Sequence, residues 1–124
     1  MSTDQLSIFD VMRAPPVSPD FELEDSVVKG QVDVSLQLPH KRMAWDQARI
    51  ELHQHTSGLW MWGTGCNRGG DGWGYRVGSK WGNFAETKDD ALYYAIDEIR
   101  KRLHRSVEKY PADAGIMAWL ETLQ

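Results

Sequence analysis

The sequence predicts an α+β fold, in which a three- or four-stranded antiparallel sheet packs on one long helix and a second helix lies at the C-terminus. Two patterns predict this fold. Apolar and polar residues alternate in short runs between residues 31 and 77, which is typical of strands with one buried face. Between residues 88 and 105 the apolar spacing changes to that of an amphipathic helix.

The strands are predicted where the alternation is clearest, which is in residues 31–38, 50–55, 59–62 and 73–77. Turns are expected at residues 56–58 and 69–72, because glycine allows the positive φ that tight turns need. Residues 63–72 superficially resemble a nucleotide-binding loop. Strand-like sequence follows them, however, and the Gly-Lys-Ser/Thr of a P-loop is absent. We therefore interpret residues 63–72 as a hairpin connection.

The long helix is predicted over residues 88–105, where one apolar stripe contains Ala91, Leu92, Ala95, Ile96, Ile99 and Leu103. Thr87 and Asp90 have the spacing of a capping box, and basic residues near the C-terminal end suit the helix dipole there. Pro111 is expected to open the final helix, since proline is tolerated in the first turn.

This arrangement gives a packing prediction. If the long helix covers the sheet, its stripe residues Leu92, Ile96 and Ile99 should be buried against the last predicted strand. Their expected neighbours on that strand are Trp73, Tyr75 or Val77.

The chain is expected to divide into an acidic N-terminal arm, residues 1–29, and an α+β domain, residues 30–124. The arm is predicted to be disordered or extended, because the proline-rich residues 14–19 cannot join a helix or sheet interior. Residues 1–39 hold seven acids and two bases, whereas residues 40–109 hold twelve bases and nine acids. That positive excess is too small to indicate nucleic-acid binding by itself.

The composition indicates a cytoplasmic protein that does not enter a membrane. No apolar run approaches the roughly 20 residues that span a bilayer. Asp4 and Asp10 lie where a signal peptide would be basic, so nothing indicates export. Cys66 is the single cysteine, which excludes an intrachain disulfide and suits a reducing compartment.

The sharpest short signal is Gln5-Leu6-Ser7-Ile8-Phe9 near the N-terminus. A disordered arm can offer a few apolar anchors to a groove and become ordered on binding. The five residues resemble the pentapeptide by which bacterial polymerases and repair proteins dock on the β sliding clamp. By that resemblance Gln5 would hydrogen-bond at the edge of the groove, and Leu6, Ile8 and Phe9 would fill its apolar pocket. The alternatives are a chance match, or packing of the same side chains on their own domain.

A second candidate site comes from the density of aromatic residues. If Leu59 and Met61 face the helix, Trp60 and Trp62 face the other way and are available to a protein partner. On such a face they could instead stack nucleic-acid bases, with basic and aromatic residues nearby in the sequence: Arg76, Lys80 and Trp81. The third interpretation is that Trp60 and Trp62 belong to the core.

Neither a metal site nor a catalytic site is predicted. His53 and His55 have a spacing that can chelate zinc, and Cys66 and Asp71 are conceivable further ligands, but nothing in the sequence fixes a third ligand. The same histidines with Glu51 lack a nucleophile and a pocket. We expect no cofactor and no enzymatic activity.

The tryptophan- and glycine-rich hairpins followed by a capped helix, over residues 45–105, resemble small proteins of bacterial plasmids and phages. The leading hypothesis is a non-enzymatic binding protein of DNA metabolism that docks on the sliding clamp through its N-terminal arm. The first alternative is an inhibitor of a host nuclease or defence complex, of the anti-CRISPR or anti-restriction type. The second alternative is a module that binds single-stranded nucleic acid.

Overall fold

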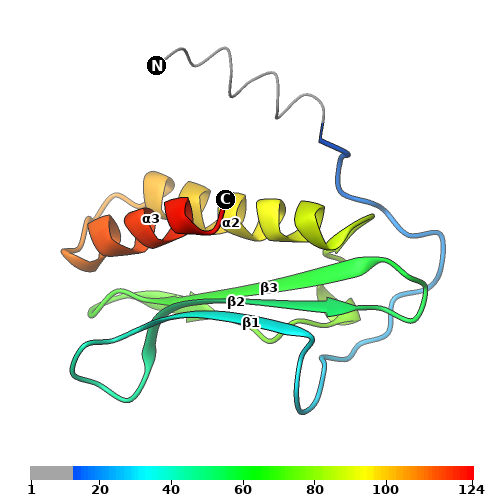
Figure 1. Cartoon of the computed structure of the whole chain (residues 1–124), viewed down its shortest axis with the longest axis horizontal. Helices are drawn as coiled ribbons and strands as arrows, with labels where there is room; N and C mark the ends of the chain where they lie inside the picture. Colours follow the sequence, from blue (N-terminus) through cyan, green and yellow to red (C-terminus); the bar gives the residue numbers. More distant parts are fainter. Residues whose placement is uncertain (1–12) are drawn as a thin grey trace.

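A computed structural model describes residues 13–124 and confirms the α+β fold, with two helices lying in a layer on one face of an antiparallel sheet (Figure 1). The elements in chain order are β1 (Val34–Pro39), β2 (Asp46–Gln54), β3 (Trp60–Asn67), β4 (Gly72–Gly74), η1 (Ser79–Trp81), β5 (Phe84–Ala85), α2 (Lys88–Arg105) and α3 (Ala112–Thr122). The strand order is β1-β2-β3-β4, and β5 pairs with the beginning of β3. In residues 13–124, no helix has the length and apolar character that crossing a membrane requires.

The strand register decides which side chains face the helices. Ile50 of β2 pairs with Leu36 of β1 and with Thr64 of β3, so the alternating residues around these three lie on the helix side. The core there is built from the following buried residues: Ala48, Ile50, Leu52, Trp62, Cys66, Ala85, Ala91, Ala95, Ile96, Ile99, Leu103, Ile116 and Leu120.

Both predicted helices are confirmed, and their ends follow local rules. Thr87 caps α2 by accepting a hydrogen bond from the Asp90 amide. At the other end, Lys109 Nζ donates to the carbonyls of Leu103 and His104, which no longer have partners within the helix. Pro111 stands directly before α3, as predicted.

The hairpin connection predicted over residues 63–72 was wrong in its first half. Residues 63–66 continue β3 and are buried, and the turn is confined to the stretch closed by the Arg68 N–H···O=C Asp71 hydrogen bond, 2.8 Å. The glycines in β3 do not form a turn. They allow neighbouring segments to pack closely against the backbone of the strand. A Cβ on Gly63 would lie 2.8 Å from the backbone nitrogen of Val77, which crosses the strand there.

The packing prediction for the long helix is confirmed for the burial of Ile96 and Ile99, whereas Leu92 is only partly buried. Of the neighbours expected on the sheet, Trp73 packs against the same core and Val77 does not. β4 ends at Gly74, so the alternation does not continue to Val77. Val77 instead joins a second buried cluster with Met61 and Phe84 on the opposite face of the sheet.

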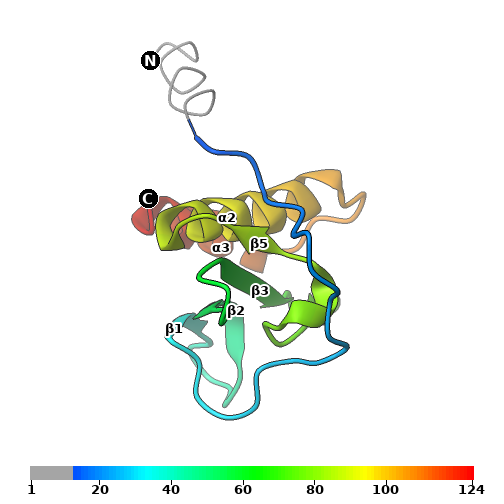
Figure 2. The same cartoon turned by 90° about the vertical axis from the view of Figure 1, so that its right-hand side faces the viewer.

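Residues 13–29, expected to form part of an arm outside the domain, are extended and lie along this second cluster (Figure 2). Val17, Phe21 and Val28 pack on the cluster. Backbone hydrogen bonds hold the segment at both ends, from Val17 to Phe84 and from Val28 to Val77, each 2.8 Å. The part of the second face around Met61 and Phe84 is therefore covered by a segment without helix or extended strand.

Candidate functional site

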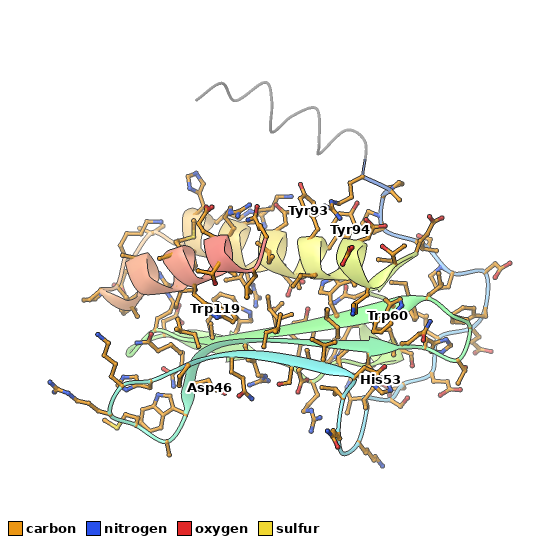
Figure 3. All side chains as sticks on the ribbon, viewed as in Figure 1. Asp46, His53, Trp60, Tyr93, Tyr94 and Trp119 are labelled. Carbon is orange, nitrogen blue, oxygen red and sulfur yellow. The ribbon has the colours of Figure 1, made fainter. Side chains whose placement is uncertain are left out.

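The clamp-like pentapeptide, residues 5–9, lies outside the described residues, but its attachment to the domain is described. Arg13 Nη1 forms an ion pair with Asp90 Oδ1 at 2.9 Å, and its guanidinium lies 4.3 Å from the centre of the Tyr93 ring. The Tyr94 hydroxyl donates to the carbonyl of Ala14. Tyr93 and Tyr94 lie on α2 beside the incoming chain (Figure 3). Residues 13 and 14 are thus fixed at the first turns of α2.

Trp60 and Trp62 face the helices, so an orientation toward solvent is wrong for Trp62. Its side chain is 6 % exposed, and its ring stacks on Tyr94 with centroids 5.6 Å apart. Trp60 is half-buried between the sheet and α2 (Figure 3). Trp62 belongs to the core, which was the third interpretation. The neighbour Met61 points to the second cluster, which exists because residues 13–29 cover that face.

Arg76, Lys80 and Trp81, the other residues of the nucleic-acid hypothesis, do come together, but apart from Trp62. Trp81 Nε1 donates to the carbonyl of Arg76 at 2.8 Å, and Lys80 Nζ lies 5.0 Å from the centre of the Trp81 ring. Both cations have acidic neighbours. Arg76 lies 3.4 Å from Glu51, and Lys80 lies 3.7 Å from Asp25. Each of these cations therefore has an acidic partner within the protein.

The conceivable metal ligands are not brought together. His53 lies on the face away from the helices, 3.4 Å from Asp33, and His55 stacks on Phe21. Cys66 is buried on the helix side, and burial raises the pKa of its thiol to about 12. Across residues 13–124, no group of three His, Cys, Asp or Glu side chains is placed to hold a metal ion.

A half-buried carboxylate that the sequence did not single out joins α2 to the sheet. Glu98 Oε2 accepts hydrogen bonds from the hydroxyls of Thr64 and Tyr75, the latter at 2.6 Å. Trp73 Nε1 donates to Thr64 Oγ1 at 3.3 Å, and Asn83 Nδ2 donates to the Tyr75 hydroxyl at 3.0 Å. Since the indole and amide nitrogens only donate, both hydroxyls direct their protons to Glu98. Burial raises the pKa of Tyr75, so its hydroxyl keeps its proton into the alkaline range. We interpret this network as a support that fixes α2 on the sheet.

A second buried charge, Arg68, joins the β3–β4 turn to the α2–α3 loop and to the first turn of α3, at the end of the molecule where β3 and α2 both finish. Its Nε and Nη2 each lie 2.7 Å from the Asp113 carboxylate, and Nη1 lies 3.0 Å from Asp71. Nη2 also donates to the carbonyl of Glu108 at 3.0 Å. This bidentate pairing holds the pKa of Asp113 below its usual range. One arginine thereby connects the β3–β4 turn to the loop between α2 and α3.

Around Arg68 the loops leave three hollows. The largest, about 620 Å³, lies between the β1–β2 loop and the glycine turn and contains Trp45 and Arg49. The second, about 580 Å³, is bordered by His40, Lys41 and Tyr110. The third, about 370 Å³, lies between Trp73 and the last turn of α2. These loops are far apart in sequence, so no local motif could have predicted that they meet.

Comparison of the chain with protein-family models, with curated proteins and with solved structures gave no match.

Proposed function

We propose that this chain is a non-enzymatic binding protein of bacterial, plasmid or phage DNA metabolism, and that its N-terminal arm docks on the replication sliding clamp. The observation that carries the proposal is the pentapeptide Gln5-Leu6-Ser7-Ile8-Phe9. The pentapeptide contains three apolar side chains and the side-chain amide of Gln5 within five consecutive residues. Such a segment supplies enough apolar area for a groove while it remains short enough to order on binding.

The attachment of the arm adds a geometric consequence. Four residue steps separate Phe9 from Arg13, which spans at most about 14 Å of extended chain. Arg13 is held by Asp90 in the first turn of α2. A clamp bound to residues 5–9 would therefore lie close to the beginning of α2. The opposite end of α2, roughly 27 Å away for 18 residues, would remain free.

The test is a fluorescence-anisotropy titration of the labelled full chain with a bacterial sliding clamp. We expect a dissociation constant in the micromolar range, about −8 kcal/mol, because a short arm loses much of its contact energy to ordering. Leu6→Ala with Phe9→Ala should abolish binding, since buried anchors carry most of the energy of such interfaces. The melting temperature should not change.

The matched control is Leu23→Ala with Met43→Ala, which removes two exposed apolar side chains elsewhere in the chain. The control should bind the clamp like the unmodified protein. Equal binding by the Leu6/Phe9 variant would show that the pentapeptide is a coincidence. A lowered melting temperature for that variant would show that the arm packs on its own domain.

A further inference from the structure

We propose that the end of the molecule built around Arg68 binds single-stranded nucleic acid. We call it the basic end, and it consists of residues 40–49, 67–72 and 100–113. These ranges contain nine of the fourteen lysines and arginines of the chain and four of its eighteen acids. The chain as a whole has a net charge of −4, so the basic end is a local reversal of sign.

The opposite end is acidic. Residues 20–33 and 86–90 hold eight acids and two bases. They lie beside the beginning of β3, where β5 pairs, whereas the basic end lies beside its last residues, where β4 pairs (Figure 1). The chain therefore presents a positive and a negative end along the direction of β3. A polyanion would be attracted to one end and repelled by the other.

Several arginines at the basic end are available for phosphates. Arg68 forms ion pairs with Asp71 and Asp113 and is not available to a ligand. In contrast, Arg102 and Arg105 form no ion pair with a carboxylate in residues 13–124. Both border the hollow beside Trp73, and the Arg102 guanidinium lies 4.6 Å from the centre of the Trp73 ring. An arginine held on an aromatic face loses little freedom when it binds a phosphate oxygen.

Arg49 provides a third such cation on the other side of β4. Its guanidinium rests on the backbone of the sheet, 3.1 Å from where a Cβ on Gly65 would be and 3.2 Å from that of Gly74. Its guanidinium donates a long hydrogen bond, 3.5 Å, to the carbonyl of Tyr75, and it has no ion pair in the described part of the chain. The two hollows lined by Arg49 and Arg102 share Asp71, Gly72 and Trp73, and the Asp71 carboxylate is paired with Arg68. A strand of phosphates that crosses the turn would meet all three arginines.

Exposed apolar side chains at the same end favour unpaired bases over a duplex. Trp45 is 49 % exposed and Met43 is 50 % exposed, both in the β1–β2 loop. That loop is ordered by His40, whose Nδ1 accepts hydrogen bonds from the amides of Arg42 and Met43. An aromatic ring fixed beside a row of cations is the usual platform for stacking single-stranded bases. In a duplex the bases are already stacked and would leave Trp45 unused.

The proposal is tested by anisotropy with a fluorescein-labelled oligothymidine over a range of salt concentrations. For single strands, each phosphate contact contributes about 0.7 to the slope of log K against log salt. Arg102→Gln with Arg105→Gln should therefore reduce that slope by about 1.4. The matched control, Arg76→Gln with Lys80→Gln, removes two cations of the opposite face and should leave both affinity and slope unchanged.

Trp45→Ala separates stacking from charge. It should weaken binding about 5- to 150-fold, the range for loss of one stacked base, and leave the salt slope unchanged. Trp81→Ala, which removes another exposed tryptophan away from the basic end, is its control. Melting temperatures of all variants verify folding, and Arg105→Glu alone replaces the double variant if the latter unfolds.

Three results would overturn the proposal. The first is equal loss of binding in the basic-end variant and in the Arg76/Lys80 control. The second is binding of duplex as tight as binding of oligothymidine together with no effect of Trp45→Ala, which would assign the arginines to duplex phosphates. The third is no binding of oligothymidine at low salt while labelled polyglutamate binds, which would indicate an acidic protein partner. The Leu6/Phe9 variant should bind oligothymidine normally, so failure of the clamp proposal does not affect this test.

Discussion

The two faces of the sheet are covered in different ways. On one face, α2 and α3 cover a continuous apolar cluster that includes Ile50, Ile99 and Leu120. On the other face, three buried side chains, Met61, Val77 and Phe84, lie under an extended segment, residues 13–29. The packing of the first face is stabilised by apolar side chains buried between the sheet and two helices. The second is held by few side chains and by backbone hydrogen bonds.

The second face also depends on close backbone approach. A Cβ on Gly78 would lie 2.3 Å from the Cα of Val27, so the covering segment touches the backbone of the domain directly there. The Ser79 hydroxyl donates to the carbonyl of Glu24, and the Lys80 amide donates to that of Ser26. We infer that the two faces respond differently to mutation. Changes on the helix side should lower global stability, and changes on the other side should also release residues 13–29.

The largest effect is expected for Phe84→Ala. Phe84 is fully buried, contacts the Phe21 and His55 rings edge-on, and accepts the Val17 hydrogen bond. Truncation of a buried phenylalanine should cost about 3–5 kcal/mol of unfolding free energy. Limited proteolysis should in addition cut residues 13–29 much faster. Leu23→Ala, in the same segment but exposed, should change neither quantity, and an unchanged cleavage pattern for Phe84→Ala would contradict this description of the second face.

Ile99→Ala tests the helix side. Ile99 lies on the buried side of α2 and is fully buried, and its truncation should cost about 2–5 kcal/mol in a urea titration. Cleavage of residues 13–29 under native conditions should stay as slow as in the unmodified protein. Val107→Ala, at a fully exposed apolar position, serves as the control. Selective release of residues 13–29 by Ile99→Ala would show that the two faces are not independent.

The helix side was predictable because its signals are local. The stripe of α2, the Thr87 cap and Pro111 before α3 each depend on residues within one or two helical turns, and the structure confirms them. The second face was not predictable in the same way. Val17, Phe21 and Val28 have no regular spacing, so nothing in the sequence joined them to the domain. Both faces of β3 are therefore buried there, one under the helices and one under residues 13–29. The alternation of apolar and polar residues consequently could not predict which face Trp62 occupies.

The candidate sites divide similarly. The pentapeptide and the cationic residues 100–105 are visible in the sequence as short runs. Arg49, Arg68 and Trp45 carry no such signal, because only the topology of the sheet places them beside the β3–β4 turn. The sequence pattern predicts turn positions for the glycines of β3, since close backbone approach and positive φ both select glycine.

A smaller loss of stability is expected for Gly78→Ala, which tests the close backbone approach on the second face. Its Cβ would collide with backbone atoms of residues 26 and 27, which cannot move without displacing the covering segment. We expect a cost of about 1–3 kcal/mol and faster cleavage of residues 13–29. The matched control is Gly65→Ala, where the neighbouring atoms belong to the flexible Arg49 side chain. If both substitutions have the same effect, backbone approach is not what holds the second face.

The smallest effect concerns Cys66 and is confined to alkaline pH. Burial raises the pKa of the thiol from 9.0 to about 12 in the folded chain. The neutral thiol therefore contributes its full stability below pH 9, and that contribution is lost as the pH rises from 9 through 12. Tyr75 and Tyr94 have pKa values raised in the same direction, so the whole chain should lose stability in this range. Cys66→Ala isolates the thiol, because the fall in urea midpoint between neutral pH and about pH 11 should be smaller in the variant than in the unmodified chain. An equal fall in both proteins would show that Cys66 is not protected by the helix-side core, and rapid alkylation of the native thiol at about pH 9 would show the same.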